Sequence, residues 1–248
     1  MNNILKVQNL KKIYHSKKEE VLAIENINFD VKKGEFIAIV GPSGCGKSTL
    51  LGILCSLEEP SGGEIIYDKN IKIAYMLQED CLFDWLTILD NCLLGLKVQN
   101  NITKENKEKV LELLNTYGLK EFINSYPKSL SGGMRQRVAL IRTLATNPDI
   151  ILLDEPYSAL DYQTRLAVSD DVYKIIKKEA KTVIMITHDI SEALAMADRV
   201  IVLSERPAKI KKIFEINLTG KTTPIENRKC PEFAKYYDEI WKEIDISV

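Results

Sequence analysis

The chain has 248 residues, and 45% of them are apolar, which is enough to bury the core of one large domain with or without an inserted subdomain. Its 34 Lys and Arg residues against 35 Asp and Glu residues give a formal net charge of −1, and this balance argues against a dedicated nucleic-acid binder, which usually has a basic excess. Five cysteines without a CxxC pair disfavour a disulfide scaffold and a zinc site and are typical of reduced cytosolic thiols.

The N-terminal residues 1–7 contain no basic region followed by an apolar stretch, so we expect no secretory signal. No apolar run approaches the roughly 18 residues that cross a bilayer, and we expect a soluble protein. The apolar runs that do occur are short, bounded by turn residues and continuously apolar, a pattern typical of strands covered on both faces of a parallel sheet. They span residues 35–40, 71–77, 150–153, 182–186 and 200–203.

Helical patterns lie between these predicted strands. They span residues 48–57, 104–117, 135–146, 164–179 and 231–244, and Asp189 with Glu192 three residues later predicts a capping box that opens another helix. Strands that alternate with helices indicate an α/β fold. The mostly helical stretch 85–147 interrupts this alternation. We therefore predict an α/β core in two parts, at residues 1–84 and 148–218. The helical subdomain at 85–147 lies between them, and a linker with a C-terminal helix follows at 219–248.

A complete phosphate-binding loop follows the first predicted strand and precedes a helix, which is the context that this pattern requires. Its glycines allow a tight turn that aims backbone N–H groups at phosphate oxygens, and the helix that follows adds its positive dipole end. Lys47 supplies a charge for the outer phosphates, and the Ser48 hydroxyl is a ligand for Mg²⁺. The loop consists of Gly41, Pro42, Ser43, Gly44, Cys45, Gly46, Lys47, Ser48 and Thr49.

The loop by itself does not name the reaction, because GTPases, kinases and ATPases all use it. A GTPase would need a guanine-reading Asn-Lys-x-Asp, which the sequence lacks. At this point a small-molecule kinase remains open. Cys45 leaves two readings as well: a thiol with a lowered pKa beside Lys47 and a helix N-terminus, whose alkylation blocks ATP, or an inert filler at a variable loop position.

Polar residues follow two of the later predicted strands. Asp154 ends the strand at 150–153 and suits Mg²⁺ binding, whereas Glu155 suits a general base that deprotonates the attacking water. His188 follows the strand at 182–186, next in sequence, where a contact to the γ-phosphate is one reading and a structural role is the other. The sequence therefore predicts that these side chains meet the phosphate loop at one edge of the sheet.

The stretch Leu130-Ser131-Gly132-Gly133-Met134 resembles the signature motif of ATP-binding cassette (ABC) proteins, where it opens a helix and touches the γ-phosphate bound by the other subunit. The resemblance covers nearly the whole chain and implies a P-loop NTPase core, similar to RecA, with a mixed sheet and an inserted helical subdomain. It also implies a role for residues elsewhere in the chain: Tyr14 as the ring that stacks on adenine, Gln78 as the Q-loop glutamine that senses Mg²⁺ and the permease, Ser158 and Asp161 as the D-loop that crosses the dimer, and His188 as the switch histidine.

The resemblance further implies ATP and Mg²⁺ as cofactors and a homodimer in which each ATP lies between one copy's phosphate loop and the other copy's residues 131–133. ATP would close this dimer and hydrolysis would let it open. The partners implied are an integral membrane permease and, through it, an extracytoplasmic solute-binding protein. The location implied is the cytoplasmic face of the cell membrane.

Looser motifs narrow the subfamily to the nitrate/sulfonate/taurine-type importers, which residues 85–87, 134–137, 203–210 and 231–241 resemble. Two departures bear on the permease partner: Asp84 stands where a proline often precedes the tryptophan, and the connection at 63–78 is short. The alternative is a soluble single-cassette ATPase acting in cofactor assembly or repair. The transported solute is not encoded in this subunit, because the permease and the solute-binding protein choose it.

Overall fold

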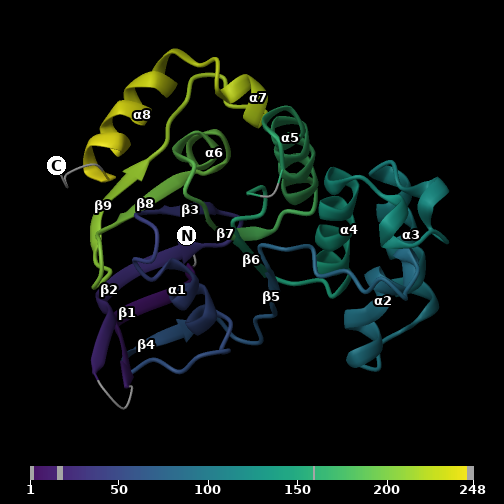
Figure 1. Cartoon of the computed structure of the whole chain (residues 1–248), viewed down its shortest axis with the longest axis horizontal. Coiled ribbons are helices and arrows are strands. Elements are labelled where there is room, and N and C mark those ends of the chain that lie inside the picture. The colour runs from purple at the N-terminus through teal and green to yellow at the C-terminus, as the bar shows by residue number, and fades with distance from the viewer. Residues whose placement is uncertain (1–2, 16–18, 159, 245–248) are drawn as a thin grey trace.

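The computed structural model describes residues 3–15, 19–158 and 160–244 and contains two β-sheets with helices around them (Figure 1). Ala159, which belongs to the predicted D-loop, and the last four residues of the predicted C-terminal segment lie outside the described residues. The fold is α/β with a mixed sheet, as predicted.

The smaller sheet is antiparallel and has the strand order β2-β1-β4. It consists of β1 (Asn3–His15), β2 (Glu20–Lys32) and β4 (Gly62–Tyr67). Gly63 is required here, because its φ is 77° and a Cβ at this position would lie 2.3 Å from the Asn9 carbonyl oxygen. The close approach of β4 to β1 therefore depends on this glycine.

The larger sheet has the order β5-β6-β7-β3-β8-β9 and is parallel except for β9. The continuously apolar runs form its central strands, and every residue of β6, β7, β3 and β8 is buried. The six strands are β5 (Ile73–Met76), β6 (Ile150–Asp154), β7 (Thr182–Ile186), β3 (Phe36–Val40), β8 (Arg199–Leu203) and β9 (Ile210–Glu215).

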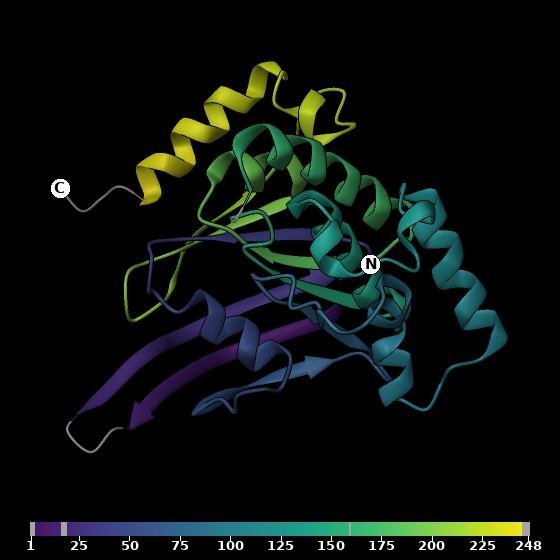
Figure 2. The ribbon, with the colours of Figure 1, turned by 45° about the vertical axis from the view of Figure 1, so that its right-hand side comes forward.

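Two hydrophobic clusters cover the opposite faces of this sheet, because successive strand residues point to opposite sides. Ile37 and Ile39 pack with α1 (Lys47–Leu54) and with β1 and β2. Phe36 and Ala38 pack on the other face with α4 (Gly132–Ala145), α5 (Tyr162–Lys178) and α6 (Ile190–Met196). In Figure 2 the long strands β1 and β2 accordingly lie on one side of the sheet and α5 on the other.

Between residues 85 and 147 the described elements are all helical, and Figure 1 places them to one side of the two sheets. They are α2 (Ile88–Val98), α3 (Lys104–Thr116), the short 3₁₀ turns Lys120–Phe122 and Pro127–Ser129, and α4. The chain ends in α7 (Pro224–Asn227) and α8 (Pro231–Ile244), the latter with the bounds expected from its periodicity. The division into two core parts, a subdomain and a linker stays a prediction.

Three helix boundaries differ from those expected by two residues or more. The first helix ends at Leu54 instead of residue 57. The helix expected from residue 135 starts three residues earlier, because the Ser131 side chain caps the N–H of Met134. Likewise α5 starts at Tyr162, because Asp161 accepts a hydrogen bond from the N–H of Thr164 at 3.1 Å. A side chain that caps a helix, and not the first apolar residue, marks both starts.

The capping box predicted at Asp189 and Glu192 is wrong in its second half. Asp189 does cap α6, since its carboxylate accepts from the N–H groups of Ser191 and Glu192. The Glu192 carboxylate instead accepts from the Thr187 hydroxyl at 2.7 Å and faces Arg165 at 3.7 Å. Tertiary partners have therefore replaced the local one, and burial raises the pKa of Glu192.

Candidate functional site

The carboxyl ends of three neighbouring parallel strands meet at one edge of the larger sheet. The phosphate loop follows β3, Glu155 follows β6 and His188 follows β7, and these strands are adjacent in the order β6-β7-β3. Crevices beyond the carboxyl ends of such strands are where α/β proteins bind ligands. A pocket of about 270 Å³ lies there, lined by Ser43, Gly44, Gly46, Lys47, Ser48, Thr49, Glu155 and Arg206.

The phosphate loop turns directly into α1, so its backbone N–H groups and the positive end of the helix dipole face the same pocket. Gly46 stands at the N-cap with a φ of 122°, and its missing Cβ leaves room for the Ala23 carbonyl oxygen. The Lys47 ammonium donates hydrogen bonds to the carbonyl oxygens of Gly41 and Pro42, both at 2.8 Å. The lysine is thereby folded back over its own loop.

The low thiol pKa considered for Cys45 is wrong. The side chain is 1% exposed and belongs to the core on the α1 face of the sheet. Burial raises the pKa of the Cys45 thiol, and the charge of Lys47 offsets this effect only in part. Cys45 therefore fills space under the loop, as the inert reading proposed.

A magnesium site would fit Ser48, which lines the pocket, and Asp154 beside it. The Ser48 hydroxyl and the Asp154 carboxylate are 3.4 Å apart, and oxygen ligands of this kind are those that Mg²⁺ prefers. The Tyr75 hydroxyl donates to the second carboxylate oxygen of Asp154 at 2.8 Å. Burial and this hydrogen bond raise the pKa of Tyr75, which keeps the phenol protonated as a donor. Tyr75 thus orients Asp154, and nothing in the sequence of its strand indicated this.

Glu155 and His188 form a pair at the pocket, with the imidazole Nδ1 3.0 Å from the glutamate Oε2. Glu155 has a φ of 44°, a left-handed conformation that is uncommon for a residue with a side chain. Its N–H donates to the Ile186 carbonyl oxygen at 2.9 Å, which ties the end of β6 to the end of β7. The backbone turn and this tie set the side chain at the pocket wall.

Gln78 meets the predicted D-loop and not the predicted metal ligands. Its amide donates to the Ser158 hydroxyl at 3.1 Å, and that hydroxyl donates to the Glu155 carbonyl oxygen at 3.0 Å. A chain of hydrogen bonds therefore links Gln78 to the residue predicted as the base. The metal role of Gln78 stays a prediction. Asp161 caps α5, and hydrogen bonds from Thr164 lower its pKa.

Tyr14 lies beside the phosphate loop. Its hydroxyl donates to the Glu58 carboxylate at 2.5 Å and is 3.2 Å from the Thr49 hydroxyl. The Lys12 ammonium is 4.9 Å from the centre of the ring, and the ring remains 38% exposed. The Glu58 contact, which sequence reasoning missed, holds the ring in one orientation, as a stacking residue requires.

The signature residues lie at the start of α4 and do not line the pocket of their own chain. Gly133 packs against α5, where an added Cβ would lie 2.9 Å from a Val168 methyl carbon. A Cβ added at Gly132 would lie 3.2 Å from a Leu160 methyl carbon. The structure thus brings the phosphate loop, the strand-end acids and His188 together and leaves residues 131–133 apart from them.

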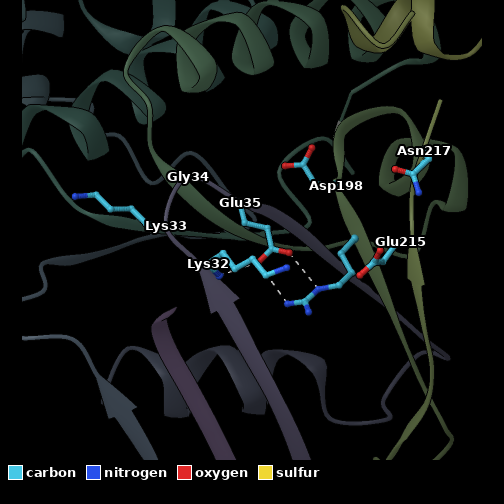
Figure 3. Close-up of a pocket in the computed structure, with 8 residues that line it drawn as sticks. Lys32, Lys33, Gly34, Glu35, Asp198, Glu215 and Asn217 are labelled. Carbon is cyan, nitrogen blue, oxygen red and sulfur yellow. Dashed lines mark hydrogen bonds and ion pairs between the residues drawn. The ribbon is translucent and has the colours of Figure 1, made fainter. Parts of the chain in front are cut away.

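A larger hollow of about 650 Å³ lies near the opposite, amino-terminal ends of β3 and β8 (Figure 3). Several of its charged side chains are paired: Arg199 faces Glu35 at 3.2 Å, and Asp198 faces Lys221 at 2.8 Å. Burial raises the pKa of Glu35 in this network. Because it lies at the end of the strands opposite to the phosphate loop, this hollow is not the candidate site.

Comparison with known proteins agrees with this geometry. A family model described as ABC transporter matches residues 24–158, more than half of the chain. The chain belongs to the ABC transporter family. The nitrate import ATP-binding protein NrtD of Synechocystis is 39% identical over 95% of this chain and 93% of its own length. The taurine import ATP-binding protein TauB of Pelagibacter ubique is 40% identical over 94% of this chain and 92% of its own.

Among solved structures, a dimeric post-hydrolysis state of the ATP-binding cassette MJ0796, bound to ADP and Pi, has a TM-score of 0.72 and 35% identity, covering 86% of this chain and 99% of that one. The resemblance of the sequence to ABC proteins is therefore confirmed, and the chain is an ATP-binding cassette ATPase. The small-molecule kinase hypothesis is wrong, and the soluble alternative is not favoured. None of the helices in the described part of the chain is long and apolar enough to cross a membrane.

Proposed function

We propose that this ATPase powers an importer for a small anionic or organic solute of the nitrate, sulfonate or taurine kind, as a homodimer on the cytoplasmic face of a membrane permease. The observation that carries the proposal is the similarity to NrtD over 95% and to TauB over 94% of this chain. An extracytoplasmic solute-binding protein delivers the solute to the permease.

Each residue of the site has a role in hydrolysis. Lys47 and the loop N–H groups hold the outer phosphates, and Ser48 and Asp154 hold Mg²⁺, which neutralises charge on those phosphates when bound. The Glu155 carboxylate takes the proton of the attacking water, and His188 positions that carboxylate and contacts the γ-phosphate. Gln78 reports on this centre through Ser158, to which it is hydrogen-bonded.

Because residues 131–133 lie apart from the pocket in their own chain, a second copy completes the site. The N–H groups at the start of α4 of that copy, where the helix dipole is positive, close over the γ-phosphate. Loss of the γ-phosphate removes the group that both copies hold, and the dimer opens. The bound nucleotide thereby determines whether the two cassettes are close together or apart.

The permease docks on the segment after Gln78. Trp85 is 73% exposed, and its ring centre lies 4.8 Å from that of Phe83, so two aromatic rings form an apolar surface patch. The same segment is attached to the signature helix, since Arg142 donates to the carbonyl oxygens of Asp80 and Cys81. Movement of α4 on ATP binding therefore reaches the docking segment directly.

Replacement of Trp85 by Glu tests this docking surface. The charge prevents burial of the patch against an apolar partner, so we expect loss of co-purification with the permease and loss of solute uptake, with basal ATP hydrolysis within about twofold of wild type. Val98→Glu, at a 76% exposed position on α2, is the matched control. Retained uptake in the Trp85 variant would contradict the docking surface.

The function itself is tested by deleting the gene and measuring uptake of labelled nitrate, taurine and alkanesulfonate. Loss of uptake of one of these solutes, restored by the wild-type gene but not by a Glu155→Gln variant, is the expected result. Purification of the tagged chain should recover an integral membrane protein. Recovery of only soluble partners, with uptake of all solutes intact, would sink the importer proposal in favour of a soluble cassette ATPase.

A further inference from the structure

The segment 203–208, which runs from the last residue of β8 into the turn before β9, lies against the phosphate loop and has one residue opposite each of the loop's three glycines. The distance from a hypothetical Cβ atom on each glycine shows which residue of this segment the glycine faces. The pairs are Gly41 with the Leu203 Cβ at 3.1 Å, Gly44 with the Arg206 Nη2 at 3.9 Å and Gly46 with the Ala208 Cβ at 3.6 Å. The segment is thus a second wall of the nucleotide site.

This segment is held firmly in place. The Ser204 N–H donates to the Lys209 carbonyl oxygen, and the Lys209 N–H donates to the Ser204 hydroxyl, both at 2.9 Å. Ala208 pairs with β2: its N–H donates to the Ala23 carbonyl oxygen, and its own carbonyl oxygen accepts from the Glu25 N–H, again at 2.9 Å. A side chain on this turn is therefore presented to the phosphate loop from a rigid base.

Arg206 is the charged residue that this base presents. Its Nη2 donates to the Gly44 carbonyl oxygen at 2.8 Å, and the side chain lines the pocket together with Lys47. A guanidinium has five N–H donors, and among the described residues this hydrogen bond is the one that the structure gives it. Of the described residues that line the pocket, Glu155 is the one acid, and it is paired with His188.

We propose that the Arg206 guanidinium binds the terminal phosphates of the nucleotide. The hydrogen bond to Gly44 fixes the orientation of the guanidinium group through Nη2. Its remaining N–H donors form the bidentate contact that guanidinium groups make with phosphate oxygens. Arg206 thus adds a second cation to Lys47, from an element that is distant in sequence from the phosphate loop. The inference concerns nucleotide binding and does not depend on which solute is imported.

The test is the affinity of purified Arg206→Met for AMP, ADP and ATP, measured by displacement of a fluorescent ADP analogue. The loss should grow with the number of phosphates: less than about threefold for AMP and about tenfold or more for ADP and ATP, since a charge-assisted contact is lost only where terminal phosphates exist. Arg206→Lys, which keeps the charge without the fork, should lie between Arg206→Met and wild type.

Lys209→Met is the matched control, because Lys209 lies on the same turn but pairs with Glu25 at 3.1 Å and does not line the pocket. Its affinities should equal those of wild type. Equal weakening of all three nucleotides by Arg206→Met would show that the arginine only braces the loop. Unchanged affinities, with an effect confined to thermal stability or to dimer formation, would likewise overturn the assignment.

Discussion

Among the strand ends in the described part of the chain, Glu155 stands at the one where a left-handed residue, a partner histidine and the pocket coincide. Its φ of 44° lies in a region that is unfavourable for a residue with a side chain. Such a conformation costs about 1–3 kcal/mol of stability and persists only where the surrounding structure enforces it. Because the Ile186 carbonyl and Ser158 both hold the Glu155 backbone, the surrounding structure determines where the carboxylate lies.

Replacement of Glu155 by Gln keeps the shape of the side chain but removes the proton acceptor. We expect ATP turnover to fall by about 10²–10⁴-fold, with nucleotide affinity unchanged, since a general base contributes on that order. Phosphate release and equilibrium binding of ATP are the two measurements. A variant that still hydrolyses ATP at near the wild-type rate would show that another group is the base.

Cys45 and Cys81 differ in burial, and alkylation should follow that difference. Cys45 is 1% exposed with a raised thiol pKa, whereas Cys81 is exposed. With iodoacetamide at neutral pH we expect Cys81 to be labelled and Cys45 to be protected until the protein is unfolded, because the thiolate is the reactive form. Peptide mass spectrometry over time measures both sites; comparable rates would contradict the buried position.

At the scale of elements, the segment that links β9 to α8 is anchored to the core. The Lys221 ammonium donates to the Ala197 carbonyl oxygen at 2.7 Å and to the Asp198 carboxylate at 2.8 Å. Asn227, in α7, is fully buried and donates to the Ala195 carbonyl oxygen. The stretch predicted as a linker from its glycine, threonine and proline content therefore attaches the C-terminal helix to α6.

Lys221→Met should reveal this attachment through pH. Burial alone would raise the pKa of Asp198, but the hydrogen bond and charge of Lys221 outweigh it, and the pKa is lowered. A carboxyl with a lowered folded-state pKa stabilises the protein above its unfolded pKa, and that contribution is lost as pH falls through the folded value. Because the Asp198 side chain is 37% exposed, solvent screens the pair, and the variant should lose about 1 kcal/mol at pH 7 and less in acid.

Denaturant unfolding of Lys221→Met and wild type at pH 7 and at a pH well below 3.8, the ordinary pKa of an aspartate, measures this difference. Lys235→Met, at an exposed position on α8, is the control and should match wild type at both pH values. A destabilisation of Lys221→Met that is the same at both pH values would mean that packing, and not the charge on Asp198, holds the segment.

At the scale of the whole molecule, each chain of the proposed dimer contributes its phosphate loop to one nucleotide site and its signature residues to the other. The phosphate loop lies at the sheet edge, and residues 131–133 lie at the start of α4, away from that pocket. On the proposed dimer each nucleotide needs one half from each copy. Two inactive variants with defects in different halves should therefore complement each other when mixed.

Lys47→Ala removes a preorganised charge, and its rate should fall about 10²–10³-fold. Ser131→Arg places a bulky cation where the signature helix begins and should be inactive as well. A mixture should recover ATP hydrolysis above either parent, because the mixed dimer has one site with an intact loop and an intact signature. Mixing Ser131→Arg with the double variant Lys47→Ala/Ser131→Arg is the control and should recover nothing. No gain in the first mixture would contradict a shared site.

Much of the fold and of the site could be predicted because the informative patterns are local. Continuous apolar runs such as 182–186 identify strands buried on both faces, and a loop of three glycines followed by Lys47 and Ser48 identifies phosphate chemistry whatever surrounds it. The placement of Asp154 and Glu155 follows as well, since parallel strands that end in polar residues present them at one edge.

Partners that come from distant segments could not be read in this way. The sequence determined the phosphate loop, the strand-end acids and the signature, because each depends on residue types at short spacing. Only the tertiary structure decided that Cys45 is buried, that Tyr75 donates to Asp154 and that Arg206 lies on Gly44. The physical reason is that these contacts arise from the packing of strands and turns far apart in the chain, about which periodicity and spacing carry no information.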